Sequence, residues 1–387
     1  MQIALSTLTP VIEGKKTMKL KYYLIILLFL LLPPALALAY SSGHAKNLSA
    51  KAEKILGLNY YYGRNGVAMN YSKAVYWFRK AASQGDINAM FDLGDAYYYG
   101  RGVKQDYSMS VYWYKKAAVR GNIHAQVALS NAYYYGRGLT LNYSKAVYWA
   151  RKAAVHGNVV AQSFLGIIYY FGYGVPQNYS KAVYWFRKAA DQGNIDAQVY
   201  LASAYYYGHG VKQNYSKAVY WFRKAADQGS ADGQYDLGDA YYYGHGVKQN
   251  YSKAVYWFRK AADQGNPHAQ VTLGTIYYLG YGVPQNYSKA VYWFRKAADQ
   301  GSADGQAHLG SAYYLGRGVK QNYSKAVHWL KKAAEQGNTD AQVALGSAYY
   351  LGRGVKQSYS KAVHWLKNAT AQGNANARAL LNKIERR

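Results

Sequence analysis

Residues 194–229 read NIDAQVYLASAYYYGHGVKQNYSKAVYWFRKAADQG, and close copies of this 36-residue stretch fill most of the chain. A unit of this length forms one supersecondary element, which cannot bury its apolar face alone and must stack on its neighbours. The period therefore predicts one elongated repeat array. All nine tryptophans of the chain follow it, at intervals of 36 residues: Trp77, Trp113, Trp149, Trp185, Trp221, Trp257, Trp293, Trp329 and Trp365.

Cap residues divide each unit into two helices. Asn194 follows a glycine, and the equivalent positions hold only Asn, Asp or Ser, which are the preferred helix N-caps. A first helix therefore begins after Asn194 and ends at Gly208, a residue that readily adopts positive φ. Asn214 occupies a second set of cap positions, and the helix that follows it ends before Gly229. Each unit is thus a predicted helix-turn-helix.

Both helices carry an apolar stripe with helical spacing. In the second helix the stripe combines small alanines with large rings. The alanines let neighbouring helices approach closely, and the tryptophan indole fills the gap between them. We expect both stripes to be buried. The stripe of the second helix is Ala218, Trp221, Phe222, Ala225 and Ala226, and that of the first is Ala197, Leu201, Ala204 and Tyr205.

A row of tyrosines lies beside the stripe of the first helix. Tyrosine combines an apolar ring with a hydrogen-bonding tip and suits recognition surfaces. Asp95 and Asp239 fall on the same side of their helices, and we predict that these carboxyls and the tyrosines bind a protein partner. The tyrosines are Tyr98, Tyr134, Tyr170, Tyr206, Tyr242, Tyr278, Tyr314 and Tyr350.

The chain carries 47 basic and 18 acidic side chains, a formal charge of +29, which attracts polyanions. Two interpretations stay open. The charge serves to bind an acidic ligand, or duplication of the repeat multiplied lysines that are merely solvated. Under the first, the second helices would present an anionic-ligand stripe opposite their apolar faces. Its clearest members are Lys217, Tyr220, Arg223 and Lys224 in one unit and Lys253, Tyr256, Arg259 and Lys260 in the next.

The first 39 residues resemble a secretory signal peptide. Lys19 and Lys21 precede an apolar run over residues 24–32, and small residues suited to cleavage lead to Ala39. Met18 begins a shorter version and is an alternative start. An uncleaved anchor is the other interpretation, but the run is shorter than the roughly 20 residues that a spanning helix needs. We therefore expect export to the periplasm or beyond from a Gram-negative bacterium, with no stable membrane span after cleavage.

Chemical sites are scarce in this sequence. It contains no cysteine, which excludes disulfides and thiolate metal sites. His209 and His245 lie in successive GHG loops, but equivalent loops hold arginine or tyrosine, which disfavours a metal site. No serine, histidine and carboxylate set stands out from the repeats. We expect no enzyme activity, cofactor or metal, and export argues against a nucleic-acid partner.

One repeat contains the pattern Leu237-Gly238-x-x-Tyr241-x-x-Gly244-x-Gly246-Val247, and further cap and helix residues follow it up to Gly265. This pattern resembles the Sel1-like repeat, a relative of the tetratricopeptide repeat. The cap and helix residues are Asn250, Lys253-Ala254, Trp257 and Lys260-Ala261-Ala262. The resemblance covers nine repeats over residues 47–373, after a short linker at 40–46 and before a C-terminal capping helix at 374–387.

This resemblance implies an all-α fold, a right-handed α/α solenoid whose first helices line the concave face. It also implies a non-enzymatic adaptor that holds a protein partner. Two other functions stay open: binding of an anionic envelope glycan such as peptidoglycan, lipopolysaccharide or exopolysaccharide, and action as a secreted host-interacting effector. Three departures, Asn65 as an extra loop residue and Ser130 and Ala202 in place of glycine, should not break the fold.

Overall fold

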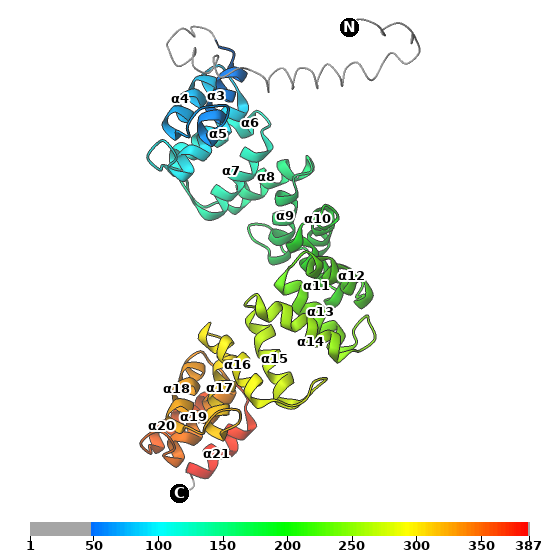
Figure 1. Cartoon of the computed structure of the whole chain (residues 1–387), viewed down its shortest axis with the longest axis vertical. Coiled ribbons are helices and arrows are strands. Elements are labelled where there is room, and N and C mark those ends of the chain that lie inside the picture. Colours follow the sequence, from blue (N-terminus) through cyan, green and yellow to red (C-terminus); the bar gives the residue numbers. More distant parts are fainter. Residues whose placement is uncertain (1–47, 386–387) are drawn as a thin grey trace, which may run out of the picture. The chain divides into compact units, whose positions relative to one another are not determined.

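The computed structural model describes residues 48–385, which form nineteen α-helices and no strand (Figure 1). We call the first helix of each repeat the A helix and the second the B helix. The A helices are α3 (Ala50–Tyr62), α5 (Ile87–Tyr99), α7 (Ile123–Tyr135), α9 (Val159–Phe171), α11 (Ile195–Tyr207), α13 (Ala231–Tyr243), α15 (Pro267–Leu279), α17 (Ala303–Leu315) and α19 (Thr339–Leu351). The B helices are α4 (Tyr71–Ser83), α6 (Tyr107–Val119), α8 (Tyr143–Val155), α10 (Tyr179–Asp191), α12 (Tyr215–Asp227), α14 (Tyr251–Asp263), α16 (Tyr287–Asp299), α18 (Tyr323–Glu335) and α20 (Tyr359–Ala371). A lone helix, α21 (Ala375–Glu385), follows them.

The predicted caps begin these helices. Asn194 Oδ1 accepts a hydrogen bond from the backbone N–H of Ala197 at 2.8 Å, and Asn214 Oδ1 accepts one from that of Lys217 at 2.9 Å. Gly208 ends α11 with a φ of 75°, in the left-handed region. The all-α class and the nine helix pairs with a final helix are therefore confirmed.

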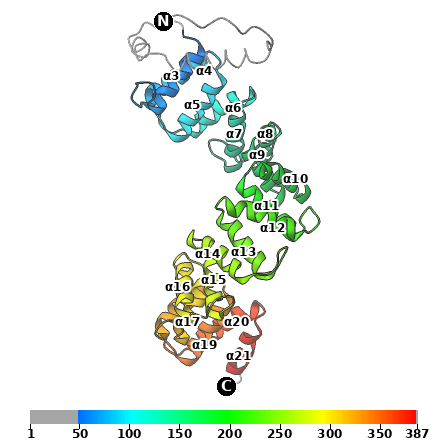
Figure 2. The same ribbon diagram turned by 45° about the vertical axis from the view of Figure 1, so that its right-hand side comes forward.

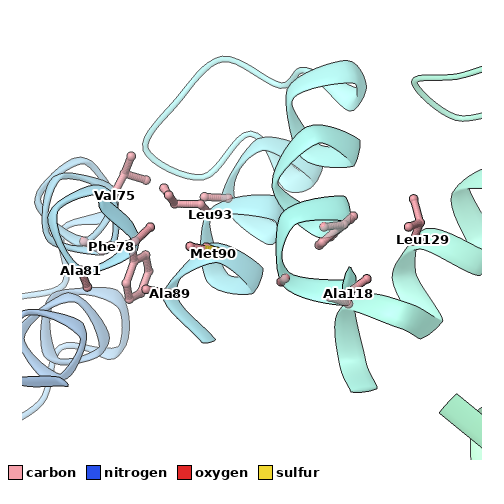
Figure 3. Packing of buried hydrophobic residues seen from close by; sticks show 14 of the residues in the cluster. Val75, Phe78, Ala81, Ala89, Met90, Leu93, Ala118 and Leu129 are labelled. Carbon is pink, nitrogen blue, oxygen red and sulfur yellow. The ribbon is translucent and has the colours of Figure 1, made fainter. Parts of the chain in front are cut away.

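The predicted stripes form the core. Leu201 and Ala218 are completely buried, and Trp221 is 9% exposed. Figure 3 shows the same packing near the N-terminal end, where Phe78 of α4 lies beside Ala89 and Met90 of α5. Within each unit, successive A and B helices thus pack on each other, as α12 does on α11 and α13, which is how a repeat buries the apolar face that it cannot bury alone.

The glycine that follows leucine in most A helices allows this close approach. A Cβ on Gly238 would lie 2.7 Å from the ring of Phe258, too near for an ordinary contact. Repeat 3 solves the problem differently, because Ala150 replaces the phenylalanine and leaves room for Ser130, whose hydroxyl donates to the Ala146 carbonyl at 2.8 Å. The prediction that Ser130 is compatible with the fold is confirmed.

Asn65 is an insertion in the first repeat. The loop between α3 and α4 has one residue more than the later A–B loops, and Asn65 adopts a φ of 54°, the one positive φ of a non-glycine residue within 48–385. Asparagine tolerates this conformation better than most residues do. Its side chain also donates to Asn59 Oδ1 at 3.0 Å. The extra residue is therefore absorbed in the loop, and both flanking helices keep their length.

The chain divides into two compact units, one ending at Asn158 and one beginning at Val159. We call their described parts unit 1 (48–158) and unit 2 (159–385). Within unit 2, successive A helices also contact each other, as α15 does with α17 and α17 with α19. Figure 2 shows A and B helices alternating along each unit. Since each repeat packs only on its neighbours, compactness in such an array is local.

The predicted signal peptide and linker, residues 1–39 and 40–46, lie outside the described residues. Between residues 48 and 385, every helix is too short or too polar to cross a membrane.

Candidate binding surfaces

Among the paired helices from α5 to α20, positive charge lies on the B helices. From α5 to α19, the A helices contain no lysine or arginine, whereas every B helix carries two or three. Few carboxylates pair with these cations: among residues 48–385, Lys331 pairs with Glu335 and Lys367 with Glu385, both at the exposed surface. From α5 to α20 the A helices themselves are therefore neutral or acidic, and the B helices are basic.

The predicted tyrosine row lies at the junctions between repeats, and we call its members the junction tyrosines. The Tyr206 hydroxyl is 2.6 Å from Nδ1 of His245 in the next repeat, and its ring packs edge-on against Tyr215 at 5.0 Å. Tyr314 likewise accepts a hydrogen bond from Arg353 at 2.9 Å. Tyr98 and Tyr278 pair with Arg137 and Arg317, and Tyr170 pairs with His209. Tyr134, Tyr242 and Tyr350 pack against Tyr143, Tyr251 and Tyr359.

These contacts engage the junction tyrosines in the fold, and their rings are half-buried. The residue that follows each of them is more exposed: Tyr207 is 64% exposed and Tyr243 is 58%. Loop side chains support these rings, as Arg101 does with its guanidinium carbon 4.9 Å from the centre of the Tyr99 ring. We call this set the A row: Tyr99, Tyr135, Phe171, Tyr207, Tyr243, Leu279, Leu315 and Leu351.

Sequence reasoning did not single out the A row. Both Tyr206 and Tyr207 lie off the buried stripe, and only the loop of the following repeat decides which of them is covered. One signal was present: position 206 is tyrosine throughout, whereas position 207 also accepts phenylalanine and leucine. Such tolerance fits a side chain that lies in solvent.

Asp95 and Asp239 occupy equivalent positions but have different neighbours. The Tyr114 hydroxyl donates to Asp95 Oδ1 at 2.6 Å, and burial raises the pKa of this carboxyl although Tyr114 partly offsets the effect. Phe258 replaces Tyr114 in the other repeat and has no hydroxyl to offer. Burial there raises the pKa of Asp239 to about 6.

Each of these carboxyls has a second one a turn earlier, which the sequence analysis missed. Burial raises the pKa of Asp92 to about 7, with Lys54 opposing the shift and Asp95 adding to it. Burial and the neighbouring charge of Asp239 raise the pKa of Asp236 to about 7. Burial thus raises the pKa of all four carboxyls in these two acid pairs.

The predicted anionic-ligand stripe separates into residues with different roles. Lys217 Nζ lies 5.4 Å from the centre of the buried Tyr205 ring, and Arg223 Nη2 donates to the Tyr241 hydroxyl of the next repeat at 2.6 Å. Lys224 Nζ instead lies 4.9 Å from the ring of Tyr220, which is 52% exposed.

The next repeat has the same arrangement. Lys253 lies over Tyr241, Arg259 donates to Tyr277 at 2.5 Å, and Lys260 lies 5.0 Å from Tyr256. Arginine thus joins repeats, and the lysine–tyrosine pair is left at the surface.

Buried glutamines provide a further junction that the sequence did not reveal. Gln198 Nε2 donates to the Ala190 carbonyl of the preceding B helix at 3.2 Å. Its Oε1 accepts a hydrogen bond from Gln228 Nε2 at 2.8 Å, so one amide bridges two successive B helices. Equivalent pairs recur in all repeats of unit 2. A buried amide must satisfy both its donor and acceptor, and this pairing does so.

His209 and His245 stack on tyrosine rings of the fold. The His209 ring stacks on Tyr179 at 4.7 Å and on Tyr207 at 5.7 Å, and His245 repeats this arrangement with Tyr215 and Tyr243. Within residues 48–385, no three histidine or acidic side chains are grouped as a metal ion would require.

Comparison with known proteins supports the assignment of the repeats. The Sel1 repeat model matches nine consecutive segments: 50–86, 87–122, 123–158, 159–194, 195–230, 231–266, 267–302, 303–338 and 339–374. A solved protective antigen of uropathogenic Escherichia coli, which displays an SLR fold, is 36% identical over 87% of this chain and 80% of its own, with a TM-score of 0.60. A Sel1 repeat protein from Oxalobacter formigenes is 32% identical over 87% and 95%, with a TM-score of 0.65.

A signal-transduction ATPase with a tetratricopeptide repeat sensor from Pyrococcus horikoshii is similar in fold alone, at 15% identity over 89% of this chain and 56% of its own, with a TM-score of 0.50. No curated protein matches the chain. Because the family model covers residues 50–374 without a break, the chain belongs to the Sel1 repeat family.

Proposed function

We propose that this chain is a non-enzymatic scaffold that holds a protein partner on its A-helix face. The observation that carries the proposal is the A row, a line of exposed large apolar side chains on helices without lysine or arginine. Sel1 and tetratricopeptide-like folds typically mediate protein–protein interactions, generally as non-catalytic scaffolds.

The A row has the chemistry of a recognition surface. Tyr207 and Tyr243 present rings that lose little conformational entropy on binding, and their hydroxyls add polar contacts. Some successive A helices contact each other directly, as α9 does with α11 and α15 with α17, which brings neighbouring members of the row close together. Asp239 lies on the same helix as Tyr243, where a carboxylate would favour a partner with basic side chains. The junction tyrosines form the half-buried base of this surface.

The test uses the natural variation of the row. Tyr207→Leu and Tyr243→Leu introduce the residue that repeats 7 to 9 already carry at this position, so the fold should be retained. A photo-crosslinking residue at position 207 or 243 is compared with one at Tyr220 on the B-helix face, in the native host. We expect one dominant adduct from the A-helix positions, identified by mass spectrometry, and its recovery should fall at least about fivefold when the other tyrosine is leucine.

Equal crosslinking from Tyr220, or adducts that persist in both leucine variants, would remove the A row from the binding site. Tyr206→Phe serves as a control, because it deletes a junction hydroxyl and leaves the A row intact. We expect a modest loss of stability from it with unchanged partner recovery.

We also propose that the chain is exported to the periplasm or beyond it, on the support of the basic, apolar and small-residue segments before Ala39. Fractionation followed by N-terminal sequencing tests this. The expected product starts after Ala37 or Ala39 and is found outside the cytosol. A full-length cytosolic protein would contradict export.

A further inference from the structure

The B-helix face carries a second repeated cluster, which we call the B row. It consists of a tyrosine and the lysine four residues later, and these tyrosines are 46–54% exposed. The pairs occur in repeats 1 to 7: Tyr76 and Lys80, Tyr112 and Lys116, Tyr148 and Lys152, Tyr184 and Lys188, Tyr220 and Lys224, Tyr256 and Lys260, and Tyr292 and Lys296.

Each cluster is ordered by its own helix. In the fifth repeat, Lys224 Nζ lies 4.9 Å from the centre of the Tyr220 ring and 5.2 Å from that of Trp221, and the two rings meet edge-on at 5.0 Å. Across the B row the lysine-to-tyrosine distance stays between 4.5 and 5.3 Å. The ammonium is therefore held at a fixed place on a half-buried aromatic base, which lowers the entropy that a ligand must overcome to order it.

No B-row lysine forms an ion pair among residues 48–385, although Asp263 of the preceding repeat acts on the charge of Lys296. The two ion pairs among residues 48–385 involve Lys331 and Lys367, which lie in repeats 8 and 9, beyond the row. In those repeats the cluster also changes, because His328 and His364 replace the tyrosine and Asn368 replaces the last lysine. Seven successive repeats thus present the same lysine outside any ion pair, and this regularity fits a ligand with a repeating charge.

We propose that the B row binds an acidic polysaccharide, a linear polymer of uronic acid units, independently of the protein partner on the A-helix face. Lysine ammonium groups would pair with the carboxylates, and tyrosine hydroxyls would donate to sugar hydroxyls. A linear polymer reaches several clusters at once, and their combined affinity exceeds that of any single one.

Two features favour this polymer over nucleic acid. The lysine lies over the face of the tyrosine ring, which is the surface that a base would need for stacking. Arginine, whose planar fork suits phosphate, is directed to the next repeat, as Arg223 is to Tyr241. The B row is left with lysine, a single point charge.

The experiment measures the affinity of the full chain for polygalacturonate at low and physiological salt. The test variant combines Lys188→Gln, Lys224→Gln and Lys260→Gln. Its matched control combines Lys181→Gln, Lys217→Gln and Lys253→Gln, which removes the same charge from the same helices but from lysines over buried tyrosines. We expect the test variant to weaken binding about tenfold and the control about threefold or less, with both effects shrinking as salt rises.

Equal losses of affinity in the two variants would show that net charge alone causes the effect, and they would overturn the proposed role of the B row. So would equal binding of neutral dextran, or tighter binding of single-stranded DNA than of polygalacturonate. If a variant unfolds, chemical acetylation of lysines in the unmodified chain tests the proposal instead. Bound polygalacturonate should protect Lys224 and its equivalents from acetylation more than Lys217 and its equivalents. Since the A row is untouched, loss of glycan binding and loss of the protein partner are separate results.

Discussion

Unit 1 and unit 2 have the same fold but satisfy their buried polar groups differently. In unit 2, every repeat contains a glutamine pair in which an exposed amide at the end of the B helix donates to a buried one on the A helix, for example Gln228 to Gln198. In unit 1, Gln84 pairs with Glu53, Arg120 approaches the sulfur of Met90, and Gln126 Oε1 has no partner among the described residues. Buried side-chain atoms without a partner within residues 48–385 lie mostly in unit 1, where they include Asp92 Oδ2, Trp113 Nε1 and Gln126 Oε1.

The difference shows that the fold and its junctions have separate requirements. Apolar stripes and caps suffice to form helix pairs, and both units have them. The junction glutamines add hydrogen bonds whose loss leaves buried polar groups unsatisfied, at about 1–3 kcal/mol each. We therefore expect unit 1 to be less stable than unit 2, although both present the A row and the B row.

The largest expected effect is the loss of a core ring in unit 2. Phe258 is fully buried, and Phe258→Ala should destabilise the chain by about 3–5 kcal/mol, since it removes the ring and leaves a cavity against Gly238. Denaturant unfolding measures it. Phe258→Leu is the control, because Leu330 and Leu366 occupy this position in repeats 8 and 9, and it should cost much less.

The acid pair of unit 2 should make stability depend on pH. Because burial raises the pKa of Asp236 from 3.8 to about 7, the folded chain keeps a proton that the unfolded chain loses at a lower pH. This contribution is complete below pH 3.8 and is lost as pH rises through about 7. Asp236→Asn should remove a decline of the order of 2 kcal/mol between pH 5 and 8. Thermal unfolding at a series of pH values checks this, and an unchanged slope in the variant would contradict it.

Breaking a glutamine pair should make unit 2 resemble unit 1. Gln228→Ala removes the donor to Gln198 Oε1 and leaves a buried acceptor unpaired, at a cost of about 1–2 kcal/mol. Lys224→Ala, one turn earlier on the same helix, is an exposed control that should change stability by less than about 0.5 kcal/mol. Equal effects of both changes would show that the pair contributes nothing specific.

Restoring the pair in unit 1 is the smallest predicted effect and has the opposite sign. His156 occupies the position of Gln228, and His156→Gln would offer an amide donor to Gln126 Oε1. We expect a gain of about 0.5–1 kcal/mol in the unfolding free energy of unit 1. The same substitution combined with Gln126→Ala should give no gain, because the acceptor is then missing.

Sequence alone revealed the local features and missed those that depend on the neighbouring repeat. Caps such as Asn194 and stripe residues such as Leu201 follow from helical spacing within one unit. The choice between Tyr206 and Tyr207 as the exposed ring depends on the loop one repeat further on. Arg223 and Gln198 likewise have partners outside their own repeat, so residues that look like surface groups act as junctions.

The structure treats the residues of the two predicted surfaces differently. Tyr206 and its equivalents were predicted as contact residues, and the structure places them beneath the more exposed A row. Lys224 and Tyr220 are exposed, as the predicted anionic-ligand stripe requires. Arg223 is instead hydrogen-bonded to Tyr241 of the next repeat.

Amide hydrogen exchange of the unmodified chain tests the central claim most directly, because it reports the stability of each helix without substitution. The B helices α10, α12, α14 and α16 share one sequence and report unit 2 as an average, while α6 and α8 have sequences of their own. The account predicts that α6 and α8 exchange faster than that average. Equal or slower exchange in α6 and α8 would contradict the claim that the glutamine pairs stabilise the stack.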